Sequence, residues 1–351
     1  MITNDFDLDK LIRENVKQLT PYSSARDEYK EIGATMVFLD ANENPYDNGV
    51  NRYPDPHQRD LKTVMAANRG VTPNQLLLGN GSDEVLDLLF RAFCEPHVDQ
   101  VITLPPTYGM YKVLAATNAI QNIEVLLDTK FQPQVNQILE KASPTTKLLF
   151  LCSPNNPTGN SVDMDKVEAL LRGFQGLVVI DEAYIDFADS NSWVDRLAEF
   201  PNLVVTQTLS KAYGLAGIRL GSCYASEAII TTLKKIKPPY NVNQLTQDQA
   251  LSRILQPDLL EKEVSNILKQ RDRLLLKLEA IDFVETIYPT SANFVLVKVD
   301  NANKRYQELI EQGVVVRNRS TQPLCAETLR FTVGTPEENS KLITALQTIA
   351  S

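Results

Sequence analysis

The sequence has few of the residues on which metal sites and disulfide frameworks depend. Its 351 residues include two histidines, and its four cysteines are scattered without a short paired spacing. A structural zinc site needs a cluster of such ligands, and a disulfide framework needs regularly spaced cysteines in a secreted chain. The composition therefore predicts reduced thiols and no metal site.

Basic charge and long apolar runs are also missing. The formal net charge is −9, which argues against a nucleic-acid surface or a basic arm for an anionic membrane. No run approaches the length of a membrane span, and the first fifteen residues lack the apolar core of a signal peptide. We expect a cytoplasmic protein with small-molecule partners, in which local donors must hold any bound anion.

What the sequence does contain is a regular alternation of short apolar runs and amphipathic stretches from residue 76 onward. The runs are "LLLG", "QVITL", "NIEVLL", "KLLFLCSP", "LVVIDEAY", "NLVVTQTLS" and "GIRLGSCYA". Nearly continuous Val, Leu and Ile runs are typical of strands buried on both faces of a mostly parallel sheet. Helical stretches such as "SDEVLDLLFRAF" and "MDKVEALLRGF" lie between some of them. The pattern predicts an α/β fold with crossover helices.

The character of the chain changes after "KKIKPPYNVNQLTQ", where the proline pair ends one unit. A long helical stretch follows, then "SANFVLVKV", the helix "NKRYQELIEQG", "VVVRN", "LRFTVG" and a final helix from about Pro336. We predict a large domain over residues 46–242 and a small α/β domain over 243–351. Residues 1–45 are expected to form an arm that packs back and contributes to the small domain.

Polar motifs follow several of the predicted strands. "GNGSDE" follows "LLL", "PPTYGMY" follows "VITL", "SPNNPTG" follows "LLFLC", "DEAY" follows "LVVI" and "TLSK" follows "NLVVTQ". Each alone has an ordinary structural interpretation: Ser82 as an N-cap, "NNPTG" as a turn, Asp181 as a structural pair and Tyr108 as a rim aromatic. Ligands of open α/β sheets bind outside the carboxyl ends of the strands. Five such motifs on one side of one sheet therefore predict a site.

A single lysine, Lys211, lies in the segment "TLSKAYGLAGIRLG". Desolvation and a neighbouring cation such as Arg219 lower the pKa of a lysine and make its amine reactive. The hydroxyls of Thr208 and Ser210, Arg219 and the backbone N–H groups at the start of "SDEVLDLL" form a candidate phosphate cradle. A reactive lysine beside such a cradle predicts a phosphorylated aldehyde held as a Schiff base.

The chain resembles a known family over nearly its whole length. The motifs "SPNNPTG", "DEAY" and "SKAYGLAGIRLG" are similar to those of fold-type I pyridoxal-phosphate enzymes of the class II aminotransferase group. "LTPY", "NRYPDP" and "LRFTVGT" resemble the histidinol-phosphate aminotransferase family within that group. The segment "ENPYDNGVNRYPDP" departs from the family, because many relatives carry a helix between "ENPY" and "RYPDP". This departure concerns the approach of Tyr53 and the mouth of the pocket.

The resemblance implies pyridoxal 5′-phosphate as cofactor and a role for each matching residue. Lys211 would form the Schiff base and then act as the base for proton transfer. Asp181 would keep the pyridine nitrogen protonated, Asn156 and Tyr184 would donate to the phenolic oxygen, and Tyr108 would stack on the ring. The phosphate would be held by Gly81, Ser82, Asp83, Thr208, Ser210 and Arg219, with Tyr53 reaching the cofactor of a neighbouring subunit. The last assignment implies a homodimer.

For the substrate, the resemblance implies Tyr22, Asn156, Arg317 and Arg330, with Arg319 close enough to Arg317 to leave that assignment open. The implied reaction is transamination between L-histidinol phosphate and 2-oxoglutarate, which gives imidazole-acetol phosphate and L-glutamate in histidine biosynthesis. Aromatic-amino-acid aminotransferases and threonine-phosphate decarboxylases have nearly the same cofactor motifs. They remain as alternatives, because pocket shape decides between these reactions.

Overall fold

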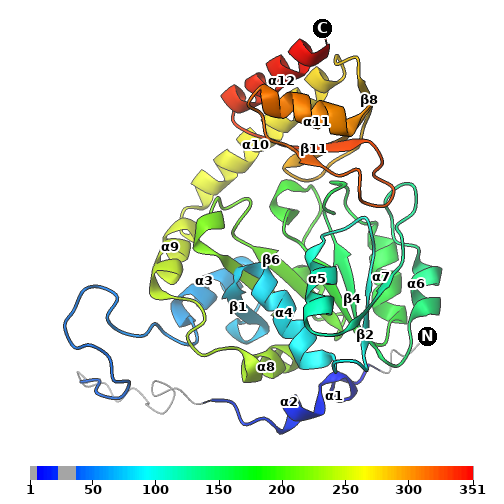
Figure 1. The fold of residues 1–351 in the computed structure, drawn as a ribbon. Coiled ribbons are helices and arrows are strands. Elements are labelled where there is room, and N and C mark those ends of the chain that lie inside the picture. The colour runs from blue at the N-terminus through cyan, green and yellow to red at the C-terminus, as the bar shows by residue number, and fades with distance from the viewer. Residues whose placement is uncertain (1–5, 23–36, 351) are drawn as a thin grey trace.

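The computed structural model describes residues 6–22 and 37–350, and these residues form a large and a small α/β unit (Figure 1). The large unit lies below the small one in the view, and the loop from residue 37 to the start of α3 extends away from both. In the described part of the chain, no helix combines the length and apolarity needed to cross a bilayer.

The strands of the large unit are β1 (Leu76–Asn80), β2 (Gln100–Thr103), β3 (Gln121–Glu124), β4 (Thr146–Cys152), β5 (Leu177–Asp181), β6 (Leu203–Thr208) and β7 (Leu220–Ala225). Its α-helices are α3 (Arg59–Asn68), α4 (Gly81–Phe93), α5 (Met110–Thr117), α6 (Val135–Lys141), α7 (Met164–Gly173), α8 (Glu227–Ile236) and α9 (Gln244–Ile254). Short 3-10 turns are η1 (Pro73–Gln75), η2 (Ile185–Phe187), η3 (Trp193–Arg196) and η4 (Ala216–Ile218). All seven apolar runs predicted as strands are therefore strands.

The seven strands form one sheet in the order β1-β7-β6-β5-β4-β2-β3 within the described residues. The pairs β2–β3, β2–β4, β4–β5 and β5–β6 are parallel, whereas β7 is antiparallel to both of its neighbours, β1 and β6. The predicted mostly parallel sheet is thus confirmed, with β7 as the exception. Because β7 runs backward, β1 points in the same direction as β6.

Helices cover both faces of this sheet, which explains the unbroken apolar runs. Leu76 and Leu78 pack into one core cluster with α3, α6, α7 and α9, whereas Leu77 packs into the opposite cluster with α4, α5 and α8. Successive side chains of a strand point to opposite faces, so a strand buried on both sides has no polar positions to alternate. The large unit is therefore a three-layer structure.

The small unit contains an antiparallel sheet in the order β10-β11-β9-β8, formed by β8 (Val284–Ile287), β9 (Phe294–Val299), β10 (Arg317–Asn318) and β11 (Thr328–Thr332). Its helices are α10 (Pro257–Leu278), α11 (Ala302–Glu311) and α12 (Pro336–Ala350). Helix α9 packs with the large unit, since Ala250 and Ile254 lie in its core. The large unit thus continues through α9, beyond the boundary expected at residue 243.

The described start of the N-terminal arm, which contains two short helices, packs on the large unit. Helix α1 (Leu8–Leu11) buries Leu11 against the α4 and α8 layer, and α2 (Glu14–Gln18) lies against α8. The Lys235 ammonium of α8 donates to the carbonyl oxygens of Val16 and Lys17, at 3.3 and 2.9 Å. These contacts place the start of the arm beneath the sheet, at the end away from the small unit (Figure 1).

Candidate functional site

The carboxyl ends of β1, β4, β5 and β6 meet at one edge of the large sheet. This edge faces the small unit (Figure 1). Because β7 is antiparallel, its first residues lie at the same edge, and Arg219 reaches the edge by preceding its strand. The sheet topology therefore gathers the motifs that the sequence scatters over more than a hundred residues.

A cavity of about 510 Å³ opens at this edge, between the large sheet and the small unit. Of the residues predicted to bind cofactor or substrate, the following line it: Ser82, Asp83, Tyr108, Asn156, Asp181, Tyr184, Thr208, Ser210, Lys211, Arg219, Arg317 and Arg330. Arg319, which the sequence left as an alternative to Arg317, also lines it. The structure therefore brings nearly the whole predicted set into one cavity.

One end of the cavity is built from backbone and small side chains at the start of α4. Gly81 has φ +75°, and a Cβ at this position would lie 2.5 Å from Nη2 of Arg219. A Cβ at Gly221 would lie 2.2 Å from the backbone nitrogen of Ser82. Glycine at both positions lets β7 and the N-terminus of α4 approach closely. The first N–H groups of a helix and an arginine beside them make a site suited to a phosphate.

The hydroxyls of β6 complete this end of the cavity. Thr208 Oγ1 donates to the carbonyl oxygen of Leu220 at 3.2 Å and lies 3.0 Å from Ser210 Oγ. The Arg219 guanidinium lies 3.7 Å from the Asp83 carboxylate and is half exposed. At that distance and exposure the pair is weak, so the guanidinium remains available to a bound anion.

Asp181 ends β5 in the floor of the cavity. The carboxylate is buried, and its Oδ2 accepts a hydrogen bond from the Tyr111 hydroxyl at 2.7 Å. Oδ1 is buried without a hydrogen-bond partner in the described part of the chain. Burial raises the pKa of Asp181 to about 6, against the opposing effect of the Tyr111 hydroxyl. A buried acceptor without a donor is costly, which marks Oδ1 as a contact that a ligand would complete.

Lys211 lies three residues beyond the end of β6, with its Nζ 5.6 Å from the centre of the Tyr184 ring. Partial burial lowers the pKa of this lysine, and the Arg330 guanidinium lowers it further, while Asp181 opposes both. The amine therefore has a larger neutral fraction near neutral pH than an ordinary lysine. Neutral amine is the form that acts as nucleophile and base.

Three polar side chains surround the middle of the cavity. The Asn156 amide donates to the Tyr184 hydroxyl at 3.4 Å, and its Oδ1 accepts from Nη1 of Arg330. The Tyr108 hydroxyl donates to Asp83 at 3.1 Å. Burial raises the pKa of both Tyr184 and Tyr108, so both phenols are protonated donors. Asn156 thus connects the large unit with the arginine of the small unit.

Three arginines of the small unit face the cavity. Arg317 and Arg330 are register partners on β10 and β11, and Arg319 follows β10 directly. None of the three forms an ion pair with a carboxylate among the described residues. Burial and the neighbouring Arg319 guanidinium together lower the pKa of Arg330 to about 10. Three guanidinium groups gathered at one wall of the cavity form a site for a strongly charged anion.

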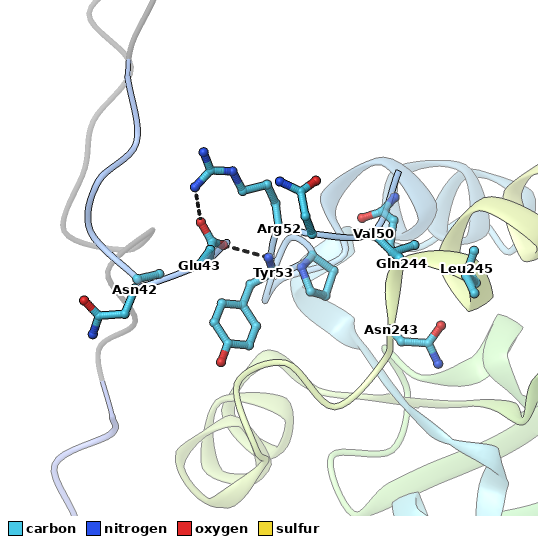
Figure 2. A pocket seen from close by; sticks show the side chains of 11 residues that line it. Asn42, Glu43, Val50, Arg52, Tyr53, Asn243, Gln244 and Leu245 are labelled. Atoms are coloured by element: carbon cyan, nitrogen blue, oxygen red, sulfur yellow. Dashed lines mark hydrogen bonds and ion pairs between the residues drawn. The ribbon is translucent and has the colours of Figure 1, made fainter. Parts of the chain in front are cut away.

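Two predicted site residues lie away from this cavity. Tyr22, at the end of the described arm, is 72% exposed. Tyr53 stacks on Tyr240 with ring centres 4.5 Å apart and lines a separate cavity of about 390 Å³ (Figure 2). There the Glu43 carboxylate accepts from the Arg52 guanidinium and from the Tyr53 backbone, each at 2.7 Å. Their assigned roles stay predictions.

Sequence reasoning missed two residues beside the site. Tyr111 lies three positions after Tyr108 on the buried face of α5 and reaches Asp181, as described above. Glu182 follows Asp181 but points to the other side of the sheet, where Ser192 and Gln207 donate to it at 2.5 and 2.8 Å. Tyr108 lies in the loop before α5 and Tyr111 lies in its first turn, so helix periodicity gives no signal for the contact between Tyr111 and Asp181.

Comparison with known proteins agrees with this geometry. Residues 34–346 match the family model described as aminotransferase class I and II. The chain therefore belongs to the class I and II aminotransferase family.

Its relatives within that family are histidinol-phosphate aminotransferases, which confirms the predicted resemblance. The enzyme from Flavobacterium johnsoniae is 62% identical over 345 residues, covering 98% of this chain and 99% of the relative. The enzyme from Flavobacterium psychrophilum is 58% identical over 346 residues, covering 99% and 100%. The structure of histidinol-phosphate aminotransferase from Sinorhizobium meliloti in complex with pyridoxal-5′-phosphate has a TM-score of 0.78 at 23% identity, covering 85% of this chain and 83% of that one.

Proposed function

We propose that this chain is a pyridoxal-phosphate-dependent enzyme that transfers the amino group between L-histidinol phosphate and 2-oxoglutarate, as part of histidine biosynthesis. The products are imidazole-acetol phosphate and L-glutamate. The observation that carries the proposal is a single cavity with a lysine of lowered pKa, a phosphate cradle at one end and three arginines without carboxylate partners at the other. Relatives at 62% and 58% identity with this name support the choice of substrate.

The residues present fit the cofactor. The unpartnered Oδ1 of Asp181 suits the protonated nitrogen of a pyridine ring. The close approach of Gly81 to Arg219 leaves a concave surface of N–H donors for the cofactor phosphate. We therefore assign the phosphate to Gly81, Ser82, Asp83, Thr208, Ser210 and Arg219, and the ring to Tyr108, Asn156, Asp181 and Tyr184.

When bound, the cofactor supplies an electron sink for the charge that develops when the substrate loses its α-proton. Lys211 Nζ is the base that takes this proton and returns one. Asp181 stays ionised against the ring nitrogen, and its negative charge holds a proton there. The phenol of Tyr184 and the amide of Asn156 donate to the oxygen on the ring, and Tyr108 covers one face.

Substrate recognition falls to the arginine set. A phosphate monoester carries nearly two negative charges, and guanidinium groups bind it through paired N–H donors. Arg330 and Arg317 are the proposed partners, and Arg319 lies close enough to contribute. The same groups suit the carboxylates of glutamate and 2-oxoglutarate. Tyr22 is proposed to close over the substrate from the arm.

A spectroscopic experiment tests the reaction directly. Purified protein loaded with pyridoxal phosphate should lose its visible absorption band on addition of L-histidinol phosphate without a keto acid. Addition of 2-oxoglutarate should then restore the band, because the second half-reaction returns the amino group. Bleaching by phenylalanine or tyrosine but not by histidinol phosphate would instead favour an aromatic-amino-acid aminotransferase. Release of carbon dioxide from threonine phosphate would favour the decarboxylase.

The variant Arg330→Lys tests whether the substrate site needs the paired donors of a guanidinium or only a positive charge. Arg330→Lys keeps one positive charge but loses the planar pair of donors. We expect kcat/KM to fall about 10- to 100-fold for both histidinol phosphate and 2-oxoglutarate, which is the scale of one or two charge-assisted hydrogen bonds. Steady-state kinetics with each substrate in turn measure the effect.

Arg305→Lys is the matched control for this change. Arg305 is a buried arginine of the same unit, paired with Asp300 at 2.7 Å and Glu308 at 2.9 Å, and it does not line the cavity. Its replacement should lower thermal stability and leave both KM values unchanged. An unchanged KM for both substrates in Arg330→Lys would show that Arg330 does not bind substrate.

We also propose a cytoplasmic homodimer in which Tyr53 reaches the cofactor phosphate of the partner subunit. The segment around Tyr53 supports this proposal, because it carries apolar side chains on the surface of the single chain. Val37 and Leu39 are 80% and 86% exposed, Tyr46 is 81% exposed, and Tyr53 is 52% exposed. Large apolar side chains exposed together are typical of a protein–protein interface.

A further inference from the structure

We propose that Tyr111 is a positioning residue for Asp181: its hydroxyl holds one carboxylate oxygen, so that the other is presented to the ring nitrogen of the cofactor. The hydrogen bond from Tyr111 to Oδ2 is 2.7 Å long, and Oδ1 has no partner among the described residues. A hydrogen bond to one oxygen favours one orientation of the carboxylate, and so one direction for the other oxygen. This inference rests on the proposed placement of the cofactor ring over Asp181.

The packing around the Tyr111 ring explains why its hydroxyl points toward Asp181. The side chain is fully buried and its ring stacks on Phe150 of β4, with centres 4.9 Å apart. The edge of the Tyr108 ring meets it at 5.5 Å and 85°. Packed on two sides by rings, the phenol reaches from α5 across β4 to the end of β5. A buried tyrosine hydroxyl needs a partner, and here it donates to the Asp181 carboxylate, with the Cys152 thiol also beside it.

The ring and the hydroxyl of Tyr111 therefore have different roles, which can be tested separately. The ring supports Tyr108, which lines the cavity, whereas the hydroxyl orients Asp181. Tyr111→Phe keeps the ring and removes only the hydroxyl. In this variant Oδ2 of Asp181 loses its hydrogen-bond donor, and the ionised form of the carboxyl group is less stabilised.

The titratable groups around Asp181 set the direction of the expected pH effect. Asp83 on α4 raises the pKa of Asp181. Asp181 in turn acts electrostatically on the following neighbours: Cys152 on β4, Lys211 and Tyr184 in the loops after β6 and β5, and Tyr108 before α5. Burial raises the pKa of Asp181, the Tyr111 hydroxyl acts in the opposite direction, and the resulting pKa is about 6. Loss of the hydroxyl must raise the pKa further, so that more of the carboxyl is protonated near neutral pH.

The first measurement uses the cofactor-free protein. Carboxyl ¹³C signals of aspartate are followed as a function of pH in the wild type and in Tyr111→Phe, and Asp181→Asn identifies the signal of Asp181. We expect the Asp181 signal to titrate at a higher pH in Tyr111→Phe. Tyr224→Phe is the matched control, because Tyr224 is equally buried and does not line the cavity. It should leave this titration unchanged.

The second measurement is the affinity for pyridoxal phosphate as a function of pH. Tyr111→Phe should weaken binding about 10- to 150-fold near neutral pH, the range for a lost hydrogen bond to a charged group. The acidic limb of the binding profile should move to higher pH. Should Tyr111→Phe fail to fold, 3,5-difluorotyrosine at position 111 keeps the shape of the side chain and is a stronger donor. The Asp181 titration should then move to lower pH.

The outcomes separate the two proposals. An unchanged Asp181 titration in Tyr111→Phe, with a stability loss equal to that of Tyr224→Phe, would overturn the positioning role and leave a structural tyrosine. A shifted titration supports it. If Asp181→Asn leaves the affinity for pyridoxal phosphate unchanged, the placement of the cofactor over Asp181 fails, and with it the functional part of this inference.

Discussion

Replacing Lys211 with alanine should lower transamination by at least about 10²- to 10⁴-fold, the effect of losing a general base. It should also abolish the covalent attachment of pyridoxal phosphate, which mass spectrometry after borohydride reduction detects. The reason is local: Lys211 is the lysine that lines the cavity, and burial beside Arg330 lowers its pKa. A small exogenous amine should restore part of the activity, because it supplies a base to the space that the side chain leaves.

Two comparisons make this result specific. Lys211→Arg keeps the positive charge and fills the space but has no neutral form near pH 7, so it should be as inactive as alanine and resist rescue. Lys112→Ala is the control lysine, since Lys112 is exposed on α5 and pairs with Glu124 at 2.9 Å. Reduction that labels another lysine, or full activity of Lys211→Ala, would refute the assignment.

The same variant tests the shared active site of the proposed homodimer. Lys211→Ala removes a residue from its own site, whereas Tyr53→Ala is proposed to damage the site of the partner subunit. In a hybrid of the two variants, one site contains both changes and the other contains neither. Refolding the two inactive proteins together should therefore recover activity. A mixture no more active than its components would show that Tyr53 does not act across subunits.

The large fold was predictable because most of its strands are buried on both faces, with the edge strand β3 as the exception. Such burial requires short, nearly continuous apolar runs, and each run predicted between residues 76 and 225 forms a strand. The small unit was harder to predict. Strand β8 has intermediate or exposed residues along its length, so no apolar run marks it, and only two residues of "VVVRN" pair as β10. Ala250 and Ile254 show that helix α9 belongs to the large unit, a matter of packing that a proline pair earlier in the chain could not reveal.

The site was predictable where a residue follows a strand, and unpredictable where it acts through another side chain. Asp181, Thr208 and Lys211 stand at or just beyond strand ends, so topology alone brings them together. Tyr111 acts through a hydroxyl whose direction depends on how α5 packs on β4. Arg317 and Arg319 are two residues apart, and both reach the cavity because β10 ends between them.

Asp181→Asn should separate cofactor binding from stability more sharply than any other change. The variant keeps the size of the side chain and loses its charge. Removing one partner of a buried charge pair costs about 3–5 kcal/mol, so we expect the affinity for pyridoxal phosphate and kcat together to fall about 10²- to 10⁴-fold. Equilibrium binding and single-turnover rates measure the two contributions.

Without cofactor, Asp181→Asn should be more stable than the wild type near neutral pH, although it binds the cofactor less tightly. The pKa of Asp181 in the folded chain is about 6, above its ordinary value of 3.8. The folded state therefore binds more protons than the unfolded state between these values, and the free energy of unfolding falls as the pH rises through about 6. Asparagine has no charge to bury, so Asp181→Asn should unfold at a higher temperature than the wild type above pH 6, while the two converge below pH 4.

Glu182→Gln supplies the matched control for both measurements. Glu182 is equally buried on the same strand end, burial raises its pKa to about 7, and it lies outside the cavity. Its replacement should flatten the decline in stability as the pH rises through about 7, and should leave cofactor affinity unchanged. If Asp181→Asn instead loses stability and affinity in parallel at every pH, the carboxylate serves the fold and not the cofactor. If Glu182→Gln lowers the affinity for the cofactor as much as Asp181→Asn does, the loss does not report a contact made by Asp181 alone.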